Sequence, residues 1–198
     1  VENSAVTVVY EQNNQTKIIK GDILIGADGS SSTIRSLLYP DVERKYAGYV
    51  AWRGTIVESE VPEVAASIPV ECITFFLAPG TQALFYIIPG KNGTLERGDR
   101  LLNWVWYWNC DDLSTVLTDC DGKTHRWSIP PGKVDLQVCE NQKEYARHHL
   151  PAPFVALVNK TQSPFVQAIT DVLAPQACHY DGRIVLIGDA LAGFRPHT

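Results

Sequence analysis

The sequence predicts a mixed α/β (α+β) fold, in which a mostly antiparallel sheet backed by helices is inserted into a smaller α/β part. The 198 residues are 45% hydrophobic and 20% charged, which is typical of a globular chain. Residues 22–29 and 181–189 mirror each other, because each is an apolar strand pattern that runs into glycine and aspartate. Between them, strand-like patterns come first and helical patterns follow. The two ends of the chain therefore form one small part that is interrupted by another.

The first residues predict a hairpin and a short helix. Residues 5–10 and 17–25 are rich in β-branched side chains and flank the polar turn EQNNQ. The apolar run that leads to Asp28 and Gly29 predicts a buried strand that ends at a functional turn. Ser30 to Ser32 offer N-caps for a helix through Leu38, which Pro40 ends.

The middle of the chain predicts a sheet and then helices. Strand-like segments joined by proline and glycine turns are residues 46–57, 70–78, 83–90, 100–110 and 124–129. Helices are expected at residues 141–150, 152–161 and 163–173, which prolines separate. A buried strand within residues 181–189 then closes the chain.

The composition excludes several classes of function. The net charge is −5 with no basic run, so nucleic acid is not an expected partner. The longest uncharged stretch, residues 72–90, is broken by Pro79-Gly80, so no membrane span is expected. Five scattered cysteines without a CxxC pair favour reduced thiols in the cytoplasm over disulfides or a metal site. Because methionine is absent even at the first position, we expect a piece of a longer chain.

Two short motifs carry the chemistry. Asp28 and Gly29 end a strand, and Ser32 and Arg35 follow at the start of a helix, whose free N–H groups favour a phosphate or a ribose. The same spacing is also compatible with a capped turn that has no ligand. Gly188-Asp189 has the same two interpretations, a ribose ligand or a closed turn.

Together, and in this order, the two motifs resemble those of the FAD-dependent aromatic hydroxylases, the single-component flavoprotein monooxygenases related to p-hydroxybenzoate hydroxylase. DGSSSTIR fits the pattern D-G-x-x-S-x-x-R, and GRIVLIGDALAGFRP fits the G-D motif with a proline seven residues after the aspartate. The stretches YAGYVAWRGTI, NWVWYWN and PFVQAITDV look most like the branch that contains 2,6-dihydroxypyridine 3-hydroxylase. The resemblance covers nearly the whole chain.

The resemblance implies an FAD-binding part made of residues 1–44 and 182–198, and a substrate-binding part at residues 45–181. In the first motif, which includes Gly26 and Gly29, Asp28 would lie near the FAD pyrophosphate and the path of the reduced nicotinamide. Ser32 and Arg35 would hold that turn.

The second motif is implied to border the flavin itself. Asp189, after Gly188, would hydrogen-bond the ribitol or ribose of FAD. Pro196 and the backbone of His197 and Thr198 would lie beside the isoalloxazine ring, so Pro196 and His197 are the candidate catalytic positions. The family's histidine three residues after the motif's aspartate is replaced by Ala192.

The sequence also departs from the family. The opening strand with a G-x-G-x-x-G turn has no counterpart here, and neither has the helix that follows the G-D motif. We therefore expect the 198 residues alone to be inactive. In the complete enzyme, NADH or NADPH would reduce FAD, and one oxygen atom of O₂ would enter an electron-rich aromatic or N-heteroaromatic ring as a hydroxyl group.

Substrate contacts are less constrained. Trp104, Trp106 and Trp108 alternate along one strand, so their indoles share a face that either lines an aromatic pocket or packs in the core. Arg53 is a candidate anchor for an anionic substrate or for the flavin, although an arginine in a sheet more often pairs with a carboxylate.

Two other functions remain open. One is a non-catalytic remnant that serves as a binding or dimerisation module, and the other is a related flavin oxidoreductase that is not a hydroxylase. A homodimer is a possible assembly. The sequence does not distinguish NADH from NADPH and does not identify the substrate.

Overall fold

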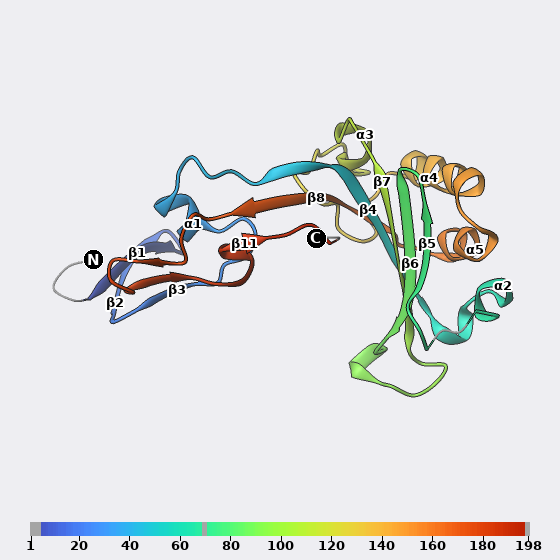
Figure 1. The fold of residues 1–198 in the computed structure, drawn as a ribbon, viewed down its shortest axis with the longest axis horizontal. Coiled ribbons are helices and arrows are strands. Elements are labelled where there is room, and N and C mark those ends of the chain that lie inside the picture. Colours follow the sequence, from blue (N-terminus) through green and yellow to red (C-terminus); the bar gives the residue numbers. More distant parts are fainter. Residues whose placement is uncertain (1–4, 69–70, 197–198) are drawn as a thin grey trace. The chain divides into compact units, whose positions relative to one another are not determined.

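The computed structural model describes residues 5–68 and 71–196, and these divide into two compact units (Figure 1). Unit 1 contains residues 1–47 and 170–198, and unit 2 contains residues 48–169. The chain passes between them within two strands, β4 (Lys45–Val57) and β8 (Phe165–Leu173). The division therefore falls at residues 47 and 169, whereas the sequence places it after residues 44 and 181.

Unit 1 begins with the predicted hairpin. β1 (Val6–Gln12) pairs with β2 (Gln15–Gly21), and Asn13 and Asn14 form the turn with φ of 54° and 57°. Asparagine tolerates this left-handed conformation, and two such residues in a row fit the twist of a hairpin. The second arm ends at Gly21 rather than at residue 25, because the next strand belongs to another sheet.

The second sheet brings together one segment from the beginning and one from the end of the sequence. β3 (Leu24–Gly26) pairs in parallel with β10 (Ile184–Leu186), which pairs on its other side with β9 (Cys178–His179). Helix α1 (Thr33–Leu38) follows β3 and has Ser32 as its N-cap, as predicted. The 3₁₀ turn η3 (Gly188–Ala190) and strand β11 (Ala192–Gly193) follow β10.

The prediction of a buried strand at residues 22–29 is wrong for these described residues. Ile23 and Ile25 are 58% and 59% exposed. β3 is the edge strand of its sheet, with β10 as its single neighbour among the described residues, so one edge and part of its surface remain open.

Unit 2 is built on an antiparallel sheet that continues into unit 1, with strand order β11-β8-β4-β7-β6-β5. The pairs β4–β7, β7–β6 and β6–β5 are antiparallel, and so is the pair β8–β11. The remaining strands are β5 (Thr74–Ala78), β6 (Thr81–Ile88) and β7 (Leu101–Asn109). The helices are α2 (Glu63–Ala66), α3 (Ser114–Leu117), α4 (Leu136–His149) and α5 (Ala152–Lys160), and η1 (Glu58–Glu60) and η2 (Lys91–Gly93) are 3₁₀ turns. These elements confirm the mixed α/β fold with a mostly antiparallel sheet backed by helices.

The core of unit 2 lies between the sheet and helices α4 and α5 (Figure 1). Phe154 of α5 contacts Phe85 of β6, with ring centroids 5.1 Å apart. Tyr145 of α4 stacks on Trp106 of β7 at 5.7 Å. Trp104 is also buried here, and its indole N–H donates to Thr161 Oγ1 at 2.8 Å. Aromatic side chains thus fill the layer between sheet and helices. The buried indole N–H groups of Trp52 and Trp108 have no hydrogen-bond partner among the described residues, in contrast to that of Trp104.

The structure corrects two predicted elements. Residues 163–173, expected as a helix, form β8, where the β-branched residues Val166, Ile169 and Val172 are buried. Residues 124–129, expected as a strand, make only isolated bridges at Thr124 and Ser128. The Asp119 carboxylate accepts the backbone N–H groups of residues 121 and 123, which favours a turn just before this segment.

Among the described residues, no helix is long and apolar enough to cross a membrane. Within the same residues, no group of three or more His, Cys, Asp or Glu side chains is arranged to hold a metal ion.

Candidate functional site

The two sequence motifs lie side by side in unit 1. Leu186 pairs with Gly26 at the end of the parallel strands, and the Ile187 N–H donates to the Gly26 carbonyl at 3.0 Å. A Cβ atom at Gly26 would lie 2.8 Å from a Leu186 methyl group and 3.2 Å from Ile34 of α1, so only glycine fits between strand and helix. Ligands of α/β sheets bind outside the carboxyl ends of such strands. Both motifs therefore occupy the edge where a ligand is expected.

Asp28 organises the turn between β3 and α1. Its carboxylate accepts the Ser32 hydroxyl at 2.5 Å and the backbone N–H groups of Thr33 at 2.7 Å and Ile34 at 3.2 Å. Partial burial tends to raise the pKa of Asp28, but these hydrogen bonds outweigh it and hold the pKa below its ordinary value. The first N–H groups of α1 are thus used within the turn. An anion at this helix end would compete with the Asp28 carboxylate.

Arg35 joins the first motif to the second. Its guanidinium donates to the carbonyls of Asp189 at 3.1 Å, Ala190 at 2.9 Å and Ser30 at 2.6 Å. The residue is 2% exposed, and Ser32, which caps its backbone N–H at 2.9 Å, is fully buried. A buried arginine that bonds to three carbonyls is a structural tie, and it fixes the backbone on which Asp189 stands.

The side-chain carboxylate of Asp189 faces solvent, while its backbone carbonyl is bonded to Arg35. The residue is exposed, and its side chain has no hydrogen bond or ion pair with any other described residue. Gly188 just before it has φ of +55°, a conformation that side-chain-bearing residues rarely adopt. Pro196 is exposed within the described residues, whereas His197 and Thr198 lie outside them. A free carboxylate on a fixed turn suits a ligand that offers hydroxyl groups.

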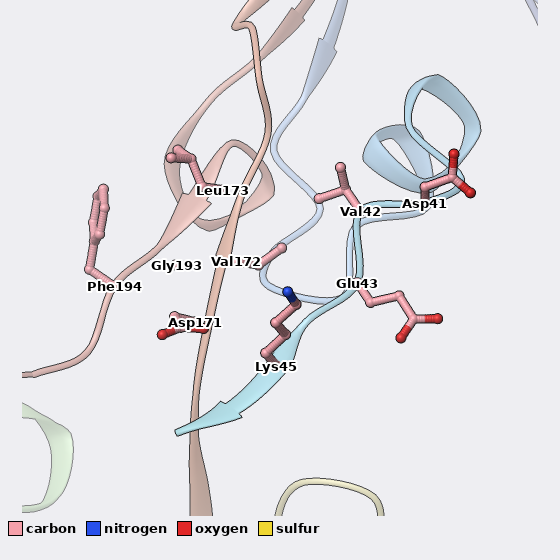
Figure 2. A pocket seen from close by; sticks show the side chains of 9 residues that line it. All are labelled: Asp41, Val42, Glu43, Lys45, Asp171, Val172, Leu173, Gly193 and Phe194. Carbon is pink, nitrogen blue, oxygen red and sulfur yellow. The ribbon is translucent and has the colours of Figure 1, made fainter. Parts of the chain in front are cut away.

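A pocket of about 450 Å³ lies in the same unit and takes its walls from three segments. Figure 2 shows Lys45 from the start of β4, Asp171 and Leu173 from β8, and Phe194 after β11 around it. The Nε of Arg195 donates a hydrogen bond to Oδ2 of Asp171 at 2.6 Å. Sequence reasoning did not single out these pocket residues, because neither a motif nor a regular spacing connects the three segments.

The structure places the candidate substrate residues on opposite faces of the sheet in unit 2. Trp104 and Trp106 are at most 1% exposed in the layer under the helices, where the Trp106 indole N–H donates to Thr81 Oγ1 at 2.7 Å. This placement favours the core interpretation of both indoles over pocket contact. Arg53 of β4 pairs with Val105 of β7 and is partly buried on the other face. It makes no ion pair with the described residues, although the carboxylate alternative predicts one.

Comparison with known proteins identifies the family. The family model described as FAD binding domain-like matches residues 46–171. The chain belongs to this family of FAD-dependent aromatic monooxygenases. The 2,6-dihydroxypyridine 3-monooxygenase of Paenarthrobacter nicotinovorans is 34% identical over 184 residues, which cover 88% of this chain and 43% of that protein. The 6-hydroxynicotinate 3-monooxygenase of Pseudomonas fluorescens is 27% identical over 206 residues, which cover 97% of this chain and 43% of that protein.

The fold agrees with this family. The structure of 2,6-dihydroxypyridine-3-hydroxylase from Arthrobacter nicotinovorans superposes with a TM-score of 0.82 at 29% identity, over 96% of this chain and 49% of that one. The chain thus spans less than half the length of the curated monooxygenases it matches. The resemblance of the chain to the FAD-dependent aromatic hydroxylases is confirmed.

Proposed function

We propose that this chain is part of an FAD-dependent monooxygenase that hydroxylates a small aromatic or N-heteroaromatic ring with NADH or NADPH and O₂. One observation carries the proposal: the two motifs lie together at the carboxyl ends of two parallel strands, and Arg35 ties them to each other. The named substrates of two relatives, 2,6-dihydroxypyridine and 6-hydroxynicotinate, support a ring that contains nitrogen.

The residues of unit 1 fit a flavin dinucleotide in one specific respect. Asp189 offers an exposed carboxylate that has no partner among the described residues, on a turn whose backbone Arg35 holds, and this suits the hydroxyl groups of a ribitol or ribose. Asp28 is engaged in its own turn, so we assign it to shaping that turn, and any effect on a pyrophosphate or a nicotinamide would be electrostatic. FAD, when bound, supplies the electron transfer and the activation of O₂.

Each described residue then has a separate task. Gly26, Gly29 and Ser32 shape the first turn, Arg35 holds the two motifs in register, and Asp189 binds cofactor hydroxyls after the bend at Gly188. Pro196 borders the flavin ring, and the same proposal extends to His197 and Thr198 after it. Arg53 is proposed to contact the substrate, whereas Trp104 and Trp106 support the sheet on which it stands. The five free cysteines favour a reducing, cytoplasmic setting.

Flavin content tests the proposal directly. The whole gene product is purified, and the bound flavin per polypeptide is measured from its absorbance. We expect stoichiometric FAD in the wild type. The Asp189→Ala variant should bind FAD at least about tenfold more weakly, because a charge-assisted hydrogen bond is lost. Glu11→Ala, at an exposed position of the hairpin, is the matched control and should retain FAD. A folded wild type without flavin would contradict the proposal and favour the non-catalytic binding module.

A further inference from the structure

The segment that leads from the second motif to Pro196 is held at several points within unit 1. At its start, the Arg35 guanidinium donates to the Asp189 carbonyl. In its middle, strand β11 pairs with β8, and the last paired residue is Gly193. The backbone pairing thus stops three residues before Pro196, so another contact has to hold the end of the segment.

Asp171 of β8 supplies that contact through an ion pair with Arg195. The Arg195 Nε lies 2.6 Å and the Nη2 lies 2.5 Å from the same oxygen of Asp171, Oδ2. Asp171 comes just before Val172, the partner of Gly193. The ion pair therefore continues the contact between the segment and β8 after the backbone pairing has ended. Figure 2 shows Asp171 in the pocket wall near this segment.

The position of Arg195 in the sequence makes this contact decisive for the path of the chain. A residue before proline is largely restricted to extended backbone conformations, and this applies to Arg195. The proline ring fixes the φ angle of Pro196 itself. Because the backbone has so little freedom here, holding the Arg195 side chain also sets the direction in which the chain enters Pro196.

The exposure of the ion pair argues against a main role in stability. The side chains of Arg195 and Asp171 are 44% and 34% exposed, and ion pairs at such positions contribute little to stability because solvent screens them. Arg35, in contrast, is buried. The loss of Asp171 should therefore act locally, on the segment that it holds.

We infer that Asp171 is a positioning residue of the flavin site, which orients Pro196 through its ion pair with Arg195. The inference rests on the proposed function, which places Pro196 beside the flavin ring, and deepens it. It adds a residue of β8, outside both motifs, to those that shape the site. Asp171 itself needs no contact with FAD.

Two measurements on the whole gene product test the inference, and the first needs no flavin. Deuterium uptake of the peptide with residues 190–196 in flavin-free protein reports how firmly the segment is held. Titration with FAD then gives the affinity, and the visible spectrum of the bound flavin reports the surroundings of its ring.

For Asp171→Asn, we expect faster deuterium uptake in this peptide and an altered flavin spectrum. FAD should bind about three- to fivefold more weakly, since a partly exposed ion pair is worth up to about that factor. The midpoint of urea unfolding should stay close to that of the wild type.

Variants of Arg195 test whether Asp171 acts through the ion pair. Arg195→Gln should reproduce the effects of Asp171→Asn, and the double variant should be no worse than either single variant. Arg195→Lys should retain most of the wild-type behaviour. Asp41→Asn is the matched control, because Asp41 is an exposed aspartate of the same pocket that makes no hydrogen bond or ion pair with the rest of the described chain. It should leave the deuterium uptake, the spectrum and the FAD affinity unchanged.

Three results would overturn the inference while the wild type holds flavin. The first is an Asp171→Asn variant with wild-type uptake and wild-type FAD affinity. The second is a double variant whose loss of affinity equals the product of the two single losses, because the two residues would then act independently. The third is a general loss of stability in Asp171→Asn. A folded wild type without flavin would instead contradict the proposed function, and the inference with it.

Discussion

Arg35 donates hydrogen bonds to the backbone carbonyls of Asp189 and Ala190, although 154 residues separate Arg35 from Asp189 in the sequence. The two motifs are thus held by one buried side chain rather than by strand pairing alone. The tie explains how Asp189 can be exposed and still stand at a fixed place. A cofactor that contacts both motifs therefore binds to backbone that is already held in place.

Arg35→Gln should destabilise unit 1. A glutamine is too short to reach all three carbonyls, and buried carbonyls without donors cost about 1–3 kcal/mol. Because more than one carbonyl loses its donor, we expect the free energy of unfolding in urea to fall by about 2–4 kcal/mol. Arg183→Gln is the control, because Arg183 also donates to a distant carbonyl, that of Asp22, but at an exposed site. If both variants lose the same free energy of unfolding, the buried hydrogen bonds of Arg35 stabilise the unit no more than the exposed one of Arg183 does.

Glu58 and Arg100 predict an acid-sensitive unit 2. The hydrogen bonds from Arg100 lower the pKa of Glu58 from 4.5 to about 2. Because the folded-state pKa is the lower one, this stabilisation is complete above pH 4.5 and is lost as the pH falls toward about 2. The free energy of unfolding should therefore decline over this range, and Glu58→Gln should flatten that part of the decline.

At neutral pH, Glu58→Gln should also lower the free energy of unfolding by about 1–3 kcal/mol, because the paired charge is lost. Urea titrations from pH 7 to pH 2.5 measure both effects. Glu140→Gln, which removes only a surface pair with Lys143, should behave like the wild type. A variant at Glu58 with an unchanged pH profile would rule out this pair as the source of acid sensitivity.

Gly54 predicts a steric effect in the core of unit 2. A Cβ atom there would lie 2.6 Å from a Thr161 methyl group and 2.7 Å from the Trp104 indole nitrogen. Gly54→Ala should therefore displace the indole, disturb its bond to Thr161, and destabilise the unit by about 1–3 kcal/mol. Near-ultraviolet circular dichroism and urea unfolding report both changes. Gly21→Ala, with its nearest neighbour at 3.7 Å, should have little effect, and a tolerated Gly54→Ala would contradict the packing described.

Local signals in the sequence predicted much of the fold. Asn13-Asn14 marked the hairpin turn, and Ser32 marked the start of α1, because these residues act through their own backbone. The segment 163–173 was assigned to a helix from its leading proline, yet its β-branched residues join the sheet as β8. Pairing with distant strands decided that segment, and such pairing has no signature within eleven residues.

The candidate site shows the same limit. The motifs singled out Asp28 and Asp189 as site residues. The hydrogen bonds from Arg35 to the carbonyls of Asp189 and Ala190 could not be predicted, because no sequence spacing indicates them. The free N–H groups expected at α1 are bonded to Asp28, a local competition that the motif alone does not resolve. The side-chain contacts of Arg53, which has no carboxylate partner among the described residues, likewise follow from distant parts of the chain and from no local pattern.

The proposed function of the protein containing this chain is the transfer of an oxygen atom from O₂ to an aromatic ring. The whole gene product, with its flavin content measured, is given NADH or NADPH, ¹⁸O₂ and either 2,6-dihydroxypyridine or 6-hydroxynicotinate. Mass spectrometry of the products is the decisive measurement. We predict a hydroxylated ring that carries one ¹⁸O atom for each pyridine nucleotide oxidised. Flavin-loaded protein that oxidises the nucleotide and leaves both rings without ¹⁸O would contradict the assignment as a hydroxylase of these rings.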